Sequence, residues 1–180
     1  ISLTNKHADY HVIGDIAPKG ICGSGLIDLL AELLRTKKMD ELGRLEEGVN
    51  EYVVVPQRHI TFSRADISEL AQAKSANVAG QRLIMRRYGV TLDQVKKYYL
   101  AGGFAWYINP DNAKQVGLLP PFPNEKIFKL GNASLEGTRV ILLNKQSRRR
   151  TVKRVSHAKR SKAIAYPKTI AELLREVDPE

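Results

Sequence analysis

A short strand that runs directly into two consecutive glycines is the sequence feature that most constrains this fold. Residues 95–100 contain β-branched and aromatic side chains, and the run ends at Ala101, Gly102 and Gly103. This pattern predicts a strand followed by a tight glycine turn. Because Gly102 and Gly103 lack Cβ atoms, the backbone there can adopt unusual φ values, and a planar ligand can lie directly on it. A nucleotide base or sugar is one candidate ligand, and a merely compact turn is the alternative.

The length and composition indicate a globular protein with a buried core. The chain has 180 residues, of which 43% are hydrophobic, which suits one domain or one large lobe of a two-lobed protein. No apolar run is long enough to span a bilayer, and the first residues lack leader features, so we expect a cytoplasmic location and no membrane contact. The single cysteine, Cys22, cannot form an internal disulfide or supply an iron–sulfur site.

The positive charge is concentrated near the carboxy terminus. Of 29 lysines and arginines, eleven lie between Gly137 and Ala171, where no acidic residue occurs; 18 basic and 19 acidic residues make up the rest. A patch of this kind suits an acidic partner, RNA or solvent. Aromatic residues for base stacking are not interleaved with the basic residues from Arg148 to Lys162, so nucleic acid is the less favoured partner.

A glycine-rich loop leads into an apolar-faced helix at residues 18–34. Gly23 and Gly25 flank Ser24, and apolar residues then recur at helical spacing. Ser24 is predicted to be the N-cap, and the free N–H groups of the first turn could bind an anion. Close helix packing is the alternative reason for the glycines. Cys22 is predicted to be buried.

The longest predicted helix covers residues 63–88. Ser63 and Asp66 form a capping-box pattern at its start, and Gly89 is placed to end it. A predicted buried stripe of mostly small residues would let a backbone or ligand ring approach closely. Gln72 and Lys74 stand at this level; Lys74 either contacts a ligand or extends its ammonium group into solvent.

The remaining segments give a coarse order of elements. Residues 51–55, 59–62 and 127–130 are predicted strands, and residues 37–50 a polar surface connection. Asn132 is a candidate cap before a helix over residues 138–143, and Ser147 before a helix to about residue 159. We therefore expect one lobe over residues 1–146 and a basic helix–strand–helix extension over residues 147–180.

Four segments, taken in order, resemble the carboxy-terminal portion of the reductive activators of corrinoid proteins. They read PKGICGSGLIDLLAELL, SRADISELAQAKSANVAGQRLI, YYLAGGFAWYINPDNAKQVGLLP and GNASLEG, and the resemblance covers residues 18–138. These ATP-dependent iron–sulfur enzymes belong to the ASKHA superfamily, together with actin, sugar kinases and heat-shock chaperone ATPases. One departure is Ala105, which replaces the last glycine of the family's usual AGGFG turn.

The resemblance implies an α/β fold, the ribonuclease-H-like second lobe of an ASKHA ATPase, with a mixed sheet flanked by helices. ATP with Mg²⁺ would lie between this lobe and a first lobe that the sequence does not contain. By position, Gly102 and Gly103 would contact adenosine, Gln72 and Lys74 its base or ribose, and Gly23, Ser24 and Gly25 would face the cleft. No catalytic or metal-binding residue is assigned, and the lobe alone is expected to be inactive.

The resemblance also implies a function for the whole activator. Such a protein uses ATP to drive electrons from an iron–sulfur cluster, [2Fe–2S] or another type, to cob(II)alamin in a corrinoid methyltransferase system, which restores Co(I). The cluster would lie in a ferredoxin-like domain outside this chain. Expected partners are the corrinoid protein, the first lobe, the ferredoxin-like domain and a possible second copy. The alternatives are an ASKHA activator or kinase lobe with another client, or a basic module that binds nucleic acid or an acidic partner.

Overall fold

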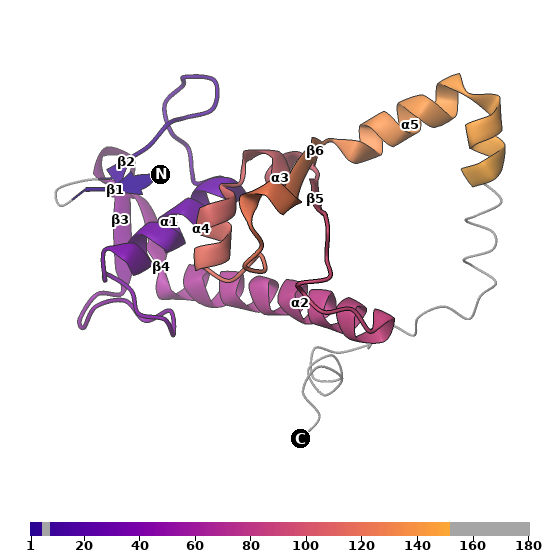
Figure 1. Cartoon of the computed structure of the whole chain (residues 1–180). Coiled ribbons are helices and arrows are strands. Elements are labelled where there is room, and N and C mark those ends of the chain that lie inside the picture. Colours follow the sequence, from indigo (N-terminus) through magenta and orange to yellow (C-terminus); the bar gives the residue numbers. More distant parts are fainter. Residues whose placement is uncertain (5–7, 152–180) are drawn as a thin grey trace.

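The computed structural model describes residues 1–4 and 8–151 of the chain (Figure 1). In chain order the elements are β1 Ser2–Leu3, β2 Ala8–Asp9, α1 Gly23–Arg35, β3 Glu51–Val55, the 3-10 helix η1 Pro56–Arg58, β4 Ile60–Ser63, α2 Arg64–Tyr88, β5 Tyr98–Ala101, α3 Gly103–Tyr107, α4 Pro110–Gln115, the 3-10 helix η2 Asn124–Lys126, β6 Ile127–Gly131 and α5 Ala133–Leu143. Helical residues 145–151 follow α5.

The described strands form three two-stranded sheets. β1 pairs with β2 and β3 pairs with β4 in antiparallel fashion, whereas β5 and β6 are parallel. The parallel pair is connected through α3 and α4, as a crossover between parallel strands requires. Both strand directions of the predicted mixed sheet are thus present, divided among small sheets, and the α/β class is confirmed.

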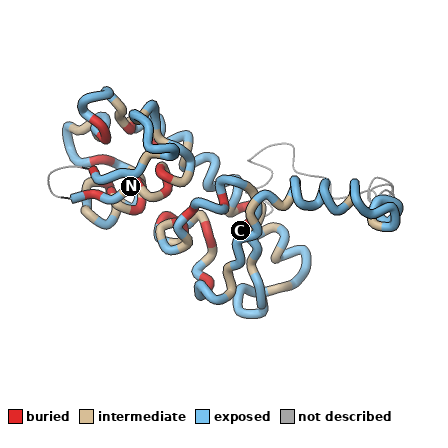
Figure 2. Tube along the Cα trace, turned by 90° about the horizontal axis from the view of Figure 1, so that it is seen from above, coloured by how far each residue is buried: buried red, intermediate tan, exposed pale blue. Residues whose placement is uncertain are grey.

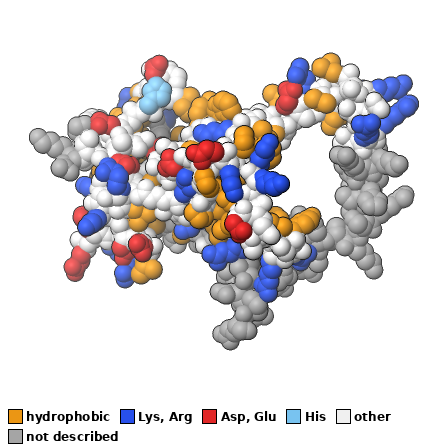
Figure 3. Space-filling model, in the orientation of Figure 1, with side chains coloured by type: hydrophobic (Ala, Val, Ile, Leu, Met, Phe, Trp, Pro, Cys, Tyr) orange, Lys and Arg blue, Asp and Glu red, His pale blue; other side chains and the backbone are white. Residues whose placement is uncertain are grey.

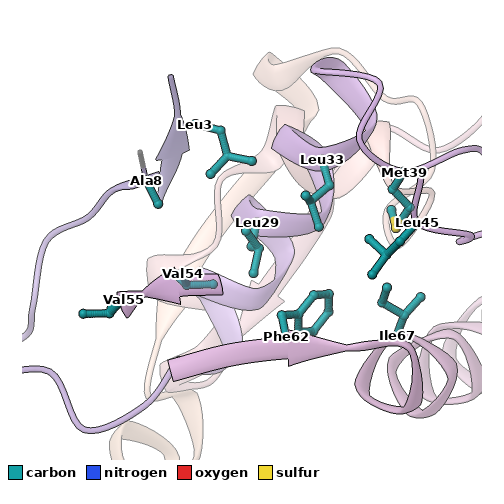
Figure 4. Close-up of a cluster of buried hydrophobic side chains, with 10 residues drawn as sticks. All are labelled: Leu3, Ala8, Leu29, Leu33, Met39, Leu45, Val54, Val55, Phe62 and Ile67. Carbon is teal, nitrogen blue, oxygen red and sulfur yellow. The ribbon is translucent and has the colours of Figure 1, made fainter. Parts of the chain in front are cut away.

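Helix α1 lies at the centre of the molecule and is buried on two sides. Leu29 and Leu33 are fully buried and pack against the β3–β4 hairpin and the start of α2 (Figure 4). Ile27 and Ala31 point to the other side, into a second cluster with β5, α3 and α4. Positions four apart share a helix face and positions two apart do not, so this alternation makes α1 the shared wall of two hydrophobic clusters.

Helix α2 begins and ends as its sequence predicts. The Ser63 side chain accepts a hydrogen bond from Asp66 N, the Asp66 carboxylate accepts one from Ser63 N, and Gly89 ends the helix at φ 61°. The prediction of a long buried stripe is wrong, because within α2 only Ile67 and Ala79 are buried. Much of α2 is therefore solvent-exposed.

Two further local predictions are corrected by the structure. Residues 37–50, predicted as a surface connection, place Met39 and Leu45 in the core, where the two residues form an isolated antiparallel bridge. Cys22, predicted to be buried, is exposed, because it stands outside the first turn of α1. The correction for Met39 and Leu45 depends on core neighbours that are distant in sequence, whereas the correction for Cys22 depends on where α1 begins.

The chain leaves the core after β6. Asn132 caps α5 by accepting from Leu135 N at 3.0 Å, so α5 begins at Ala133, before the predicted residue 138. Figures 1 and 2 show α5 extending away from the rest of the molecule and exposed along its length. The next helix is capped by Asn144, which accepts from Ser147 N, rather than by Ser147 itself.

The structure describes only the beginning of the basic extension that is predicted over residues 147–180. Lys and Arg side chains lie along the projecting arm formed by α5 and residues 145–151 (Figure 3). Residues 152–180, and with them most of the predicted extension over residues 147–180, lie outside the described residues. Within residues 1–4 and 8–151, no helix combines the length and the apolar composition needed to cross a membrane.

Candidate functional site

The two predicted glycines form the junction between β5 and α3. Gly102 has φ 103° and ψ 164°, a conformation that side chains strongly disfavour, and its N–H donates to Gly131 O at 2.6 Å. Helix α3 begins at the next residue, Gly103. A Cβ atom at Gly103 would meet no heavy atom within 4 Å, so the backbone there faces open space that a ligand can approach.

The second glycine-rich segment lies against this junction. A Cβ atom at Gly23 would stand 2.9 Å and 3.0 Å from two ring carbons of Phe104, the residue that follows Gly103. Gly23 is therefore closely packed against the Phe104 ring, in line with the packing alternative that the sequence left open. Gly25 is buried beside Ile21 and Cys22.

Ser24 has a different role from the predicted one. It lies in the first turn of α1, and Cys22 occupies the N-cap position without a capping side-chain hydrogen bond. Ser24 Oγ is 3.3 Å from Cys22 Sγ. This hydrogen bond, followed by that from the backbone of Gly25, lowers the pKa of the exposed Cys22 thiol.

A cleft of about 1180 Å³ separates α1 from α2. One wall comes from α1, the other from α2, and the segments around residues 37–43 and 115–118 close it. Its lining includes Ile27, Leu30 and Leu34 of α1, Ile67, Leu70, Ala71, Ala73, Lys74 and Asn77 of α2, and Phe104, Val116 and Gly117. A largely apolar cleft with a few polar groups is typical of small-molecule sites.

Polar contacts fix the segment that closes this cleft. Gln81 Nε2 donates to Leu118 O at 3.3 Å and also to the side-chain oxygen of Asn77, so α2 is tied to residues 115–118. Gln115 Nε2 donates to Ala31 O at 3.2 Å, which ties the same segment to α1. The two walls are thereby held at a defined separation.

Lys74 supplies the cationic group within the cleft. Its Nζ lies 3.4 Å from the position that a Cβ atom would take at Gly117, which has φ 70°. Among the described residues, the Lys74 ammonium forms no hydrogen bond or ion pair. It is thus free to donate to a ligand.

The lining of the cleft carries charges of both signs. Lys37, Arg64, Asp40 and Glu41 border it. Arg44 donates from its backbone N–H and its guanidinium to Asp40, the latter at 2.7 Å, and these bonds lower the pKa of the Asp40 carboxyl. Asp40 is therefore ionised and already paired at neutral pH.

The structure brings together only some of the predicted site residues. Lys74 and Phe104 line one cleft, and Gly23 touches the Phe104 ring. Gly102 and Gly103 immediately precede Phe104 without lining the cleft, and Gln72 lies outside it. Residues two apart on a helix point in directions that differ by roughly 200°, so Gln72 and Lys74 do not share a face.

Among the residues that line the cleft, sequence reasoning missed Phe104, Asn77 and Gly117 as candidate ligand contacts. Phe104 directly follows the glycine pair, and Asn77 shares a helix face with Lys74 at i,i+3, so both carried a local signal. Gly117 carried none, because only the tertiary fold places it beneath Lys74. Between residues 8 and 151 and in residues 1–4, no group of three His, Cys, Asp or Glu side chains could hold a metal ion.

Comparisons with known proteins agree with this fold. The family model described as the C-terminal domain of RACo, the ASKHA domain, matches residues 1–170. The corrinoid activation enzyme RamQ of Eubacterium limosum is 27% identical over a 170-residue alignment that covers 81% of this chain. A solved structure of a reductive activator for corrinoid, iron–sulfur protein is 32% identical with a TM-score of 0.74 over 92% of this chain. The chain spans 29% of the length of each of these two proteins.

Proposed function

The chain belongs to the family of RACo C-terminal ASKHA domains, and from this premise we propose that it is the nucleotide-binding lobe of an ATP-dependent reductive activator. The activator returns cob(II)alamin to Co(I) in a corrinoid methyltransferase system by transfer of one electron. The electron comes from an iron–sulfur cluster held outside this chain. ATP supplies the energy, and this lobe grips its adenosine part.

One observation carries the proposal: Lys74 of α2 and Phe104, next to the glycine pair, line the same cleft. Two motifs 30 residues apart in sequence thus offer one ligand an apolar wall and a free cation. We propose that adenosine occupies this cleft and that Gly102 and Gly103 lie along its open end. Gln72 stays a prediction for a second contact from α2, as do Gly23, Ser24 and Gly25 for the cleft edge.

We propose that the ligands for the iron–sulfur cluster, and most of those for the Mg²⁺ and phosphates of ATP, lie outside this chain. One cysteine in the sequence does not fit an iron–sulfur cluster, and the described residues offer no metal-binding group. Mg²⁺ would arrive with the nucleotide phosphates, whose other ligands belong to a first lobe. We therefore propose that this lobe alone neither hydrolyses ATP competently nor carries electrons.

The proposed partners follow from the family and from the length of the relatives. They are the corrinoid protein, the first ASKHA lobe, a ferredoxin-like domain and a possible second copy, all in the cytoplasm. The name of the matched solved structure refers to a corrinoid, iron–sulfur protein as the target of activation. A change in lobe orientation with nucleotide state would bias docking on that target.

Calorimetric titration of the chain with MgATP tests the nucleotide site. Gly103→Val places a branched side chain in the open space beside the cleft, and we expect it to weaken MgATP binding at least about tenfold by obstructing the ligand. Gly137→Val is the matched control, because Gly137 lies in α5 and a Cβ atom there also meets nothing within 4 Å. Equal affinity of both variants and the wild type would remove the adenosine assignment from Gly103.

A further inference from the structure

We propose that the exposed side of the Phe104 ring is the surface on which the purine base of the ligand stacks, with Gly23 as the residue that positions the ring. The inference rests on the proposed nucleotide-binding function and adds the group that recognises the base. It assigns Phe104 a binding role and explains why α1 begins with a glycine.

The Phe104 ring is held on one side and free on the other. Its edge lies so close to Gly23 that any side chain there would have to displace it. Even so, Phe104 keeps 49% of its surface exposed. Among the described residues, the ring pairs with no other aromatic ring and no cation, in contrast to Tyr99–Phe128 and Tyr98–Phe122. The ring thus rests against Gly23 and still offers an exposed aromatic surface to a ligand.

The surroundings of the ring suit a flat apolar ligand with polar edges. The opposite wall includes Ala71 and Ala73, whose small side chains leave room, while Leu30 and Leu34 provide further apolar surface. Lys74 offers its unpaired ammonium to a ribose hydroxyl, a purine nitrogen or the first phosphate. Stacking of a base on an aromatic ring contributes about 1–3 kcal/mol.

The charge distribution favours the base over the phosphates as the group that enters this cleft. Its lining contains three basic residues, Lys37, Arg64 and Lys74, and two acidic ones, Asp40 and Glu41, so the basic residues outnumber the acidic ones by only one. A triphosphate carries several negative charges, and a lining with so small a net positive charge would compensate them poorly. We therefore place the purine inward and the phosphates outward.

Titrations of the full 180-residue chain, followed by ligand-observed NMR, test the inference with adenosine, tripolyphosphate and MgATP as probes. Phe104→Leu keeps an apolar side chain but removes the ring, and we expect adenosine affinity to fall about fivefold or more. Phe104→Tyr keeps the ring and should bind within about twofold of the wild type. Gly23→Ala should also weaken adenosine binding, because its methyl group displaces the ring.

Phe128→Leu is the matched control, since Phe128 is a partly exposed aromatic residue on β6 that does not line the cleft. On the wild-type chain, nuclear Overhauser contacts between the adenine protons and the Phe104 ring provide a second measurement that needs no variant. We expect such contacts, together with selective loss of adenosine binding in Phe104→Leu.

The outcomes separate this inference from the proposed function. Wild-type binding of MgATP, with Phe104→Leu unchanged and no contacts to the ring, would overturn the stacking role and leave the nucleotide-binding function intact. Binding of tripolyphosphate without adenosine would overturn it as well. A wild-type chain that binds neither adenosine nor MgATP would contradict the proposed function itself.

Discussion

At the scale of single residues, buried side chains of α1 connect the two hydrophobic clusters. Leu29 has no exposed surface and packs into the cluster with Phe62 and Val54, while Ile27 and Ala31 pack into the other. Interiors are close-packed, so a side chain removed from this wall leaves a cavity that its neighbours fill only in part.

Leu29→Ala should therefore lower the free energy of unfolding by about 2–5 kcal/mol. Urea denaturation followed by circular dichroism measures the change. Leu142→Ala in α5 is the matched control, because Leu142 is 67% exposed and should cost less than about 0.5 kcal/mol. Similar losses for both variants would show that α1 is not the common wall of the core.

At the scale of elements, the start of α2 depends on a reciprocal set of hydrogen bonds. The Asp66 carboxylate accepts from Ser63 Oγ at 2.6 Å and from Ser63 N at 2.8 Å. The first of these bonds is the main reason why the pKa of Asp66 is lowered. A pKa lower in the folded state means that the ionised carboxylate stabilises the fold.

The lowered pKa of Asp66 predicts how the stability of a variant depends on pH. Asp66→Asn should be less stable than the wild type at pH 7, by less than about 1 kcal/mol because the site is exposed. The stabilisation is present above the unfolded pKa, near 4, and is lost as pH falls through the lower folded pKa, so the difference should shrink below about pH 4.

Thermal denaturation at pH 7 and at pH 3 measures this difference. Glu69→Gln, an exposed change one turn further along α2, controls for the loss of one negative charge. A gap between wild type and Asp66→Asn that stays constant from pH 7 to pH 3 would show that the carboxylate does not stabilise the helix start.

The same elements show which predictions a sequence supports. The Ser63–Asp66 capping box and the helix end at Gly89 were predicted because each depends on residues within one turn. The burial of Met39 is not predictable locally because it depends on packing against distant segments, and the exposure of Cys22 depends on the exact residue at which α1 begins. Both Asn144 and Ser147 are residue types that cap helices, and only the structure shows that Asn144 accepts the capping hydrogen bond from Ser147 N.

For the candidate site too, some residues could be predicted from the sequence and others could not. The glycine pair and Lys74 carried signals that a family resemblance could place, whereas the contact between Gly23 and Phe104 exists only in the folded molecule. Gln72 and Lys74 were predicted as one pair of contacts, but helical periodicity places residues two apart on different sides of the helix.

At the scale of the whole molecule, the cleft lies at the boundary between the two hydrophobic clusters. Leu30, Leu34 and Leu70 pack against both clusters and also line the cleft. A ligand bound there contacts both halves of the molecule at once. The proposed nucleotide, bound there, would therefore bias the relative arrangement of the two clusters.

Hydrogen exchange of the 180-residue chain with and without MgATP tests most directly whether this lobe binds a nucleotide in the cleft. We predict slower amide exchange in the segments that line it, around residues 70–77, 103–105 and 115–118, with the β3–β4 hairpin unchanged. Absence of any change at MgATP concentrations that saturate a nucleotide site, or slower exchange confined to the basic arm, would contradict the assignment.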